Sequence, residues 1–372
     1  MKPDRINSLT GLRAVVMMTV FCSHLLYLAE TPFHGVYAWI DNGRLGVNFF
    51  LVLSGFVLAL GYSKKLNADN ITQDVRFVKN RFSKIYIPYL ITTILAVPWY
   101  IFIVSLGEGS VNVKLLLIRL IINIGMVQSA VPFEKYSTSI NDVSWFISTI
   151  FIIYLITPGI LRLNNKAAKH YTLPKLLFLI LSVLFVYCCC YMIIRWIEYI
   201  RYADRGLSII YRSPLIRVFP FLLGIVTYNI YCIPDKLQIK NGSYIEATGI
   251  SVFLLWWIFA DKSGLPTLIN ECTDMLVSML AVLILSFSRK GIISGFLSNE
   301  KMLYLGKISL EFYLVHYLII NYGMIAAKQF GLDIEISAVP LTILFFVLSL
   351  GGSWLIHSFT ERLLPVLRKG IQ

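Results

Sequence analysis

Residues 174 to 194 read PKLLFLILSVLFVYCCCYMII, a run in which Lys175 is the single charged side chain. About 20 apolar residues are enough for an α-helix to cross the hydrocarbon core of a bilayer, so this stretch predicts a transmembrane helix. Comparable runs recur along the whole 372-residue chain. Hydrophobic residues make up 57% of the chain and charged residues 14%, whereas about a quarter of a soluble domain is charged. The composition therefore argues against a soluble protein.

Apolar runs bounded by charge, Gly or Pro predict ten transmembrane helices. They cover residues 12–30, 46–62, 85–105, 143–160, 174–194, 214–231, 244–260, 269–288, 303–326 and 336–357. With the N-terminus inside, the cytoplasmic segments would hold about two-thirds of the 33 lysines and arginines, as the positive-inside rule expects. We predict an all-α polytopic bundle, one domain over residues 1–372, with both termini in the cytoplasm. Topology thus accounts for most of the net charge of +13, and no nucleic-acid partner is expected.

The cysteines predict neither a disulfide framework nor a metal site, because the six of them contain no C-x-x-C pair.

The longest outward connection, residues 106–142, contains an apolar run, 111–128, that is typical of a re-entrant or interfacial helix. A connection of this length often covers a functional site.

Arg13 and His24 are candidate functional residues in the first predicted span. Ten residues separate them, so an ideal helix turns about 1100° from one to the other and places both on one face, roughly 16 Å apart. A polar group inside a bilayer must be paired or hydrated, which makes such residues functional candidates. The alternative, an interhelical hydrogen bond from His24 and an interfacial anchor in Arg13, stays open.

The second and third spans carry two further motifs. In GVNFFLVLSGF, residues 46–56, Ser54 and Gly55 are small enough for a helix or a substrate to approach the backbone, and packing is the commoner use. Arg81 and Lys84 lie one helical turn apart at the cytoplasmic mouth of the third span. They could hold a phosphate, or they could anchor the topology.

Later motifs place polar residues inside apolar helices. The fourth span opens with Asp142 and Trp145 and continues to Tyr154. The ninth span contains LGKISLEFYLVH, residues 305–316, in which Glu311 and His316 are costly to bury unless they meet partners or water. Tyr154 and Tyr313 are expected to be structural.

Taken in order, these motifs resemble those of acyltransferase family 3 over nearly the whole chain. The spacing of Arg13 and His24, followed by the Ser-Gly-Phe segment, is the most specific part of the resemblance. The resemblance implies a membrane protein of about ten helices that acylates sugars, drawing on acetyl-CoA or a related thioester. Some members also carry an extracytoplasmic soluble domain after the last helix, and no such domain is expected here because the sequence ends soon after the last predicted span.

Residue by residue, the resemblance implies that His24 is catalytic and that Arg13 binds the donor or orients the site. Arg81 and Lys84 would bind donor phosphates, and the passage would be lined by Ser54 and Gly55. Supporting positions are Asn48, Trp145, Tyr154, Glu311, Tyr313 and His316. The chain departs from the family where many members have an Asp at position 48, a Glu at position 150 and an Arg at position 84. The carboxylates that many members have at positions 48 and 150 are therefore replaced here by Asn48 and Ile150.

The expected function is transfer of an acyl group, most simply acetyl, from cytoplasmic acyl-CoA to a hydroxyl of a cell-envelope glycan such as O-antigen, capsule or exopolysaccharide. His24 would act as general base or become acylated, and both remain open. The expected location is the bacterial inner membrane, with the lipid bilayer, acyl-CoA and a free or lipid-linked glycan as partners and homo-oligomerisation left open. The alternatives are a polysaccharide or lipid-linked sugar transporter, against which no inverted repeat is found, and a scaffold subunit.

Overall fold

The computed structural model describes residues 6–66, 70–133, 139–202, 207–233, 242–288 and 291–369. Within these ranges every regular element is helical, and nine helices are long and apolar enough to cross a membrane. The predicted all-α, polytopic membrane fold is therefore confirmed. The long helices are α3 (Gly43–Tyr62), α4 (Ile71–Glu108), α7 (Trp145–Ala168), α8 (Leu173–Tyr202), α10 (Pro214–Cys232), α11 (Gly242–Phe259), α12 (Thr267–Phe287), α15 (Ser309–Gln329) and α16 (Ile334–Lys369).

The remaining helices are short. They are α1 (Asn7–Ser23), η1 (Leu26–Glu30), α2 (His34–Ile40), α5 (Val113–Ile124), η2 (Gln128–Ala130), η3 (Asp142–Ser144), α9 (Leu207–Arg212), η4 (Ala260–Lys262), α13 (Ile292–Leu297) and α14 (Glu300–Lys307). Two predicted spans are cut short or divided in the structure, and several others lie within longer helices. The first was expected to run to residue 30, but α1 ends at Ser23, because the side chains of Ser23 and His24 take the carbonyl of Val20 that a continuing helix would use. The ninth is divided at Ile308 into α14 and α15.

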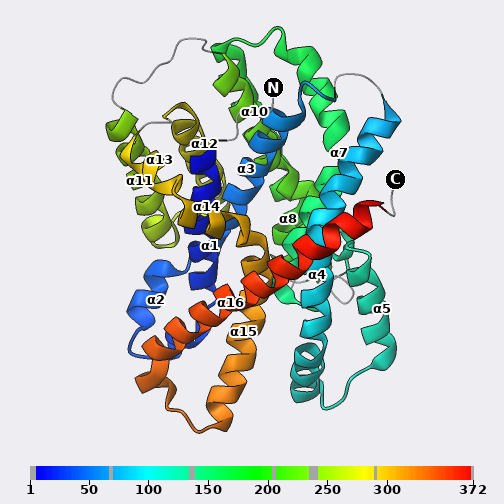
Figure 1. Cartoon of the computed structure of the whole chain (residues 1–372), viewed down its shortest axis with the longest axis vertical. Helices are drawn as coiled ribbons and strands as arrows, with labels where there is room; N and C mark the ends of the chain where they lie inside the picture. Colours follow the sequence, from blue (N-terminus) through cyan, green and yellow to red (C-terminus); the bar gives the residue numbers. More distant parts are fainter. Residues whose placement is uncertain are drawn as a thin grey trace. The chain divides into compact units, whose positions relative to one another are not determined.

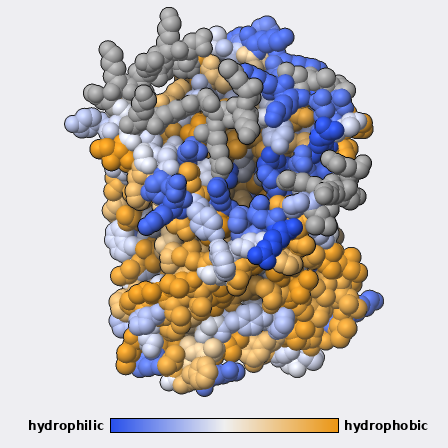
Figure 2. Space-filling view, viewed as in Figure 1, coloured by the Kyte–Doolittle hydropathy of each residue, from blue (hydrophilic) through white to orange (hydrophobic). Residues whose placement is uncertain are grey.

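Large apolar side chains are exposed along the long helices, as expected for contact with lipid. On α8, Phe178 is 73% exposed, Leu181 65% and Phe185 69%. Figure 2 shows apolar residues exposed over much of the face drawn. Contiguous apolar surface of this extent is rare on soluble proteins and is the ordinary outer surface of a membrane bundle.

The chain divides into two compact units, each of which is described by itself. The first comprises residues 1–19, 42–75 and 153–307, and the second comprises residues 20–41, 76–152 and 308–372. In the first unit, α3 packs against α10 and α12 (Figure 1). A Cβ at Gly55 of α3 would lie 2.0 Å from the Phe221 carbonyl oxygen, and one at Gly224 of α10 would lie 2.0 Å from that of Val52. These two glycines therefore allow α3 and α10 to cross in backbone contact.

In the second unit, α15 packs against α16. Gly352 of α16 leaves room for the side chains of Val315 and Ile319. The same helix α15 contributes Leu318 to a buried cluster with Ala96 and Tyr100 of α4. Helix α15 thus lies between two neighbours of its own unit, and its polar residues are held in protein.

The long segment between α4 and α7 contains α5, which has 12 residues and is too short to span a bilayer. Its Leu117 and Ile121 are exposed one turn apart, while Asn123 is buried. Asn123 accepts hydrogen bonds from the Tyr89 hydroxyl and from the backbone N–H of Ile140. A short helix with one apolar exposed face and one tethered face suits the predicted re-entrant or interfacial placement, which stays a prediction.

Candidate active site

His24 is a half-buried residue directly after α1, where the helix ends. Its Nδ1 atom lies 2.8 Å from the carbonyl oxygen of Val20 and 3.4 Å from the hydroxyl oxygen of Ser23. The Ser23 hydroxyl itself donates to the Val20 carbonyl. The last carbonyls of a helix lack backbone partners, so these side chains satisfy the end of α1 and fix the imidazole ring at the same time.

His316 of α15 is fully buried beside His24. Its Nε2 atom lies 3.3 Å from Nδ1 of His24, and the two rings meet edge to face with centroids 5.0 Å apart. Its Nδ1 atom lies 3.0 Å from the carbonyl oxygen of Phe312. The ring of Phe312 is nearly parallel to that of His316, and Phe21 packs against both. The imidazole of His316 is therefore held in one orientation.

These distances assign the protons of both imidazoles when they are neutral. A carbonyl oxygen can only accept, so Nδ1 of His316 must donate to Phe312, which leaves the lone pair of His316 on Nε2. Nδ1 of His24 faces the Val20 carbonyl and this lone pair, so it must also carry its proton. The lone pair of His24 is then on Nε2, which makes no hydrogen bond to any residue that the structure describes.

An open imidazole nitrogen of this kind can accept a proton or attack a carbonyl carbon. Asp142 and Asp41 are the carboxylates whose charge reaches His24. Their negative charges oppose part of the cost that burial of the ring imposes on the imidazolium ion. Tyr317 packs edge to face on the same ring, with centroids 5.5 Å apart.

Buried Glu311 and half-buried His357 form a second pair in this unit. Oε1 of Glu311 lies 2.8 Å from Nδ1 of His357 on α16. Glu311 is 4% exposed, and its Oε2 atom has no partner among the described residues. The costly carboxylate on the ninth span therefore meets a histidine that the sequence had not distinguished.

Two contacts fasten η3 and the residue before it to α15. The hydroxyl of Tyr313 donates to the Val143 carbonyl at 2.6 Å, and the side-chain amide of Asn141 donates to the Leu314 carbonyl at 2.8 Å. Trp145 is buried at the first residue of α7. Tyr313 thus holds the segment that contains Asp142 near the helix that carries His316.

The basic pair lies on α4 within the same unit. Arg81 is half-buried, with its guanidinium 5.8 Å from the centre of the Phe77 ring, whereas Lys84 is exposed. Both are positioned by one helix and lie one turn apart. A role in binding the donor stays a prediction for both.

The other predicted site residues lie in the first unit. Arg13 is half-buried on α1, and Ser54 is half-buried on α3. Gly55 is buried at the crossing with α10, so the packing alternative describes its surroundings. Tyr154 is buried on α7. Neither the catalytic role predicted for Arg13 nor the donor-binding role predicted for Ser54 and Gly55 is tested by these positions.

Asn48 is fully buried in a polar network that joins α3, α10 and α12. Its amide nitrogen donates to Glu271 at 3.0 Å and to Asp274 at 3.4 Å, and its oxygen accepts from Arg217 at 3.1 Å. Arg217 also binds both oxygens of Glu271, at 2.8 and 3.0 Å. Asn48 therefore links two carboxylates to one guanidinium.

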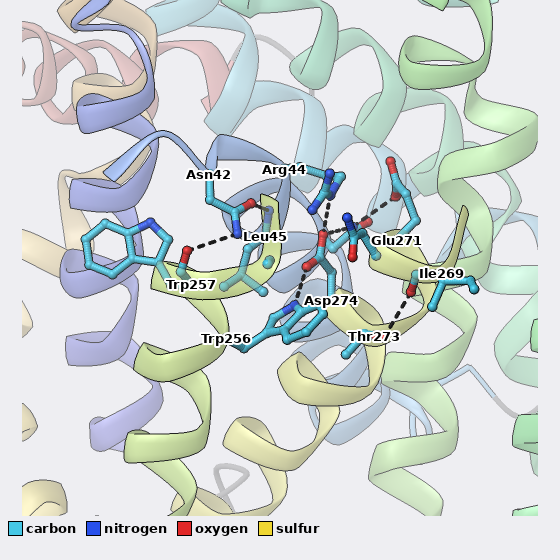
Figure 3. A network of polar contacts seen from close by, with 12 residues as sticks. Asn42, Arg44, Leu45, Trp256, Trp257, Ile269, Glu271, Thr273 and Asp274 are labelled. Atoms are coloured by element: carbon cyan, nitrogen blue, oxygen red, sulfur yellow. Dashed lines mark hydrogen bonds and ion pairs between the residues drawn. The ribbon is translucent and has the colours of Figure 1, made fainter. Parts of the chain in front are cut away.

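Figure 3 shows the contacts of this network around Asp274. Asp274 accepts from Arg44 at 2.7 Å and from the indole N–H of Trp256 at 2.7 Å. Two arginines and two carboxylates then balance in charge around the neutral Asn48 side chain. Sequence reasoning did not identify Glu271 or Asp274, although acidic residues within the apolar run 269–288 were a usable signal.

Long apolar helices that carry buried ionisable groups are typical of a multi-pass membrane protein. The candidate site in this protein is the pair of His24 and His316. A family model described as an acyltransferase domain matches residues 6–358. The chain is 26% identical over 384 aligned residues to the acyltransferase MdmB of Streptomyces mycarofaciens, covering 98% of this chain and 92% of that protein. It is 35% identical over 106 residues to protein 2 in the picA locus of Rhizobium radiobacter, covering 28% of this chain and 51% of that protein.

No solved structure matches the chain significantly. The chain belongs to acyltransferase family 3, and it is a membrane-spanning enzyme that transfers acyl groups. The resemblance drawn from the sequence motifs is thereby confirmed.

Proposed function

We propose that this enzyme transfers an acyl group, with acetyl as the expected group, from acyl-CoA to a hydroxyl of a cell-envelope glycan such as O-antigen, capsule or exopolysaccharide. The observation that carries the proposal is the His24 imidazole, whose Nδ1 is held by acceptors while Nε2 is left with its lone pair. We place the enzyme in the bacterial inner membrane with both termini in the cytoplasm. The distribution of lysines and arginines supports this orientation.

A thioester is already activated, so the reaction chiefly needs a base for the acceptor hydroxyl. Nε2 of His24 takes the hydroxyl proton while the hydroxyl oxygen bonds to the thioester carbonyl carbon. The tetrahedral oxyanion then collapses, the carbon–sulfur bond breaks, and the departing thiolate takes the proton back from Nε2. The products are the sugar ester and the free thiol, and His24 returns to its starting state.

The same lone pair could attack the thioester directly and give an acyl-imidazole, which the acceptor hydroxyl would then cleave. The two routes differ in kinetics. Direct transfer requires both substrates to be bound together, whereas the covalent route gives ping-pong kinetics and a thiol burst without acceptor. Measuring thiol release in the absence of acceptor therefore separates them.

Donor binding is assigned to Arg81 and Lys84. Their charges suit the phosphates of a CoA thioester, and the half-buried guanidinium of Arg81 is positioned over Phe77. Lys84 can contribute only as a point charge, because an ammonium group cannot form the two parallel hydrogen bonds that a guanidinium makes with phosphate. We expect Arg81 to contribute more than Lys84.

The test is the acyl content of the surface glycan in a deletion strain, measured by proton NMR before and after mild alkali. Wild type should restore an alkali-labile acyl signal, and His24→Ala at equal membrane abundance should not. His170→Ala, which changes an exposed histidine, is the matched control and should restore the signal. An unchanged acyl signal in the deletion strain would refute the glycan acceptor.

A further inference from the structure

The His24 ring has hydrogen-bond acceptors from two helices. Of the acceptors around its Nδ1 atom, Val20 and Ser23 belong to the end of its own helix, whereas His316 comes from α15. The Val20 carbonyl, at 2.8 Å, is the nearest of these acceptors and by itself favours a proton on Nδ1. The contact with His316, at 3.3 Å, adds an acceptor from a second helix.

When neutral, His316 can accept a hydrogen bond only at Nε2. Its Nδ1 proton is committed to the Phe312 carbonyl at 3.0 Å, and the ring is fixed by its stacking on Phe312 and by Phe21. The side chain is fully buried, so no water competes for the Nε2 lone pair from its surface. A neutral, fixed acceptor at 3.3 Å stabilises the tautomer of His24 that carries its proton on Nδ1.

We infer that His316 is a positioning residue for His24: it holds the imidazole in the orientation and tautomer that leave Nε2 free for the acceptor hydroxyl. The inference rests on the proposed function, in which Nε2 of His24 is the base. When Nε2 takes a proton, the Nδ1–H of the imidazolium becomes a stronger donor, and its hydrogen bond to His316 strengthens with it. His316 therefore favours the charged intermediate over the resting state without touching either substrate.

Amide side chains can separate this role from packing. A glutamine amide reaches the position of Nε2, so His316→Gln retains an acceptor for His24. An asparagine amide reaches only the position of Nδ1, so His316→Asn keeps the bond to Phe312 and loses the contact with His24. We expect His316→Asn to lower kcat by about 10- to 100-fold with little change in KM for the donor, and His316→Gln to recover most of the rate. His170→Gln is the exposed control.

A second measurement reports the tautomer without any substrate. The chain has five histidines, so two-bond proton–nitrogen NMR spectra of histidine-labelled protein are simple, and His24→Gln identifies the His24 signals by their loss. Wild type and His316→Gln should show His24 protonated on Nδ1, and His316→Asn should show a mixture with the Nε2-protonated form. Unchanged kcat and an unchanged tautomer in His316→Asn would overturn the inference. The NMR measurement uses no substrate, so it tests the role of His316 even if the acceptor is not a glycan.

Discussion

Replacing Asn48 by aspartate tests how the buried network of the first unit is balanced. The Asn48 amide nitrogen donates to Glu271 at 3.0 Å and to Asp274 at 3.4 Å. An ionised carboxylate cannot donate, so the change removes a hydrogen bond to a charged group, which is worth about 1.5–3 kcal/mol. It also places a third negative charge in a network of two arginines and two carboxylates.

Coulomb energies set the scale of the effect. At an effective dielectric constant of about 20, each carboxylate at these distances repels the new charge by about 5 kcal/mol, and Arg217 at 3.1 Å attracts it by about the same amount. Arg44 offsets part of the remaining repulsion. The introduced group can escape the repulsion by staying protonated. Aspartate in water has a pKa of about 3.9, so protonation at pH 7 costs about 4 kcal/mol. We therefore predict that Asn48→Asp destabilises the protein by about 2–4 kcal/mol.

The assay is unfolding in mixed detergent and SDS micelles followed by tryptophan fluorescence, to which Trp256 contributes beside Asp274. Glu271→Gln in the Asn48→Asp background restores the charge balance and supplies an amide donor. The double variant should therefore be more stable than Asn48→Asp alone. Asn112→Asp is the matched control, because exposed Asn112 only accepts at the start of α5 and aspartate can replace it there. Wild-type stability of Asn48→Asp, or no recovery in the double variant, would refute the reasoning.

Gly55→Ala should sharply reduce the folded, monodisperse fraction on size-exclusion chromatography, because its Cβ would overlap a backbone oxygen, whereas Gly35→Ala, where nothing lies within 4 Å, should not. Glu311→Leu and His357→Leu should each destabilise the protein, because each leaves its partner without this contact. The double variant removes both groups, so it should lose less stability than the two single losses added, and additive losses would argue against the pair. Arg81→Ala should raise KM for acetyl-CoA severalfold and leave KM for acetyl-pantetheine, which lacks phosphates, unchanged; equal effects on both donors would exclude phosphate binding.

Sequence patterns predicted the class of fold because bilayer thickness imposes a length on every spanning helix. The second span, expected at 46–62, is observed as α3, Gly43–Tyr62, and the fifth, expected at 174–194, lies within α8. The end of α1 was missed because side-chain hydrogen bonds from Ser23 and His24, rather than a change in hydropathy, terminate the helix. Apolar periodicity contains no information about such a cap.

The sequence predicted individual residues of the candidate site but not which of them contact one another. His24, Glu311 and His316 stood out because ionisable groups are costly inside apolar helices. Their partners depend on contacts between distant segments. His316 lies 292 positions from His24, and His357 lies 46 positions from Glu311. A single sequence ranks residues by the cost of burying them, and tertiary structure decides which partner reduces that cost.

The most direct test of the account is acceptor-dependent thiol release by the purified enzyme in lipid nanodiscs, with acetyl-CoA as donor and the deacetylated surface glycan as acceptor. Wild type should release thiol in equal amount to new alkali-labile ester. His24→Ala should reduce that rate by about 100-fold or more, as expected for loss of a general base, while remaining as stable as wild type to detergent. Retention of the full rate in a correctly folded His24→Ala variant would contradict the central claim.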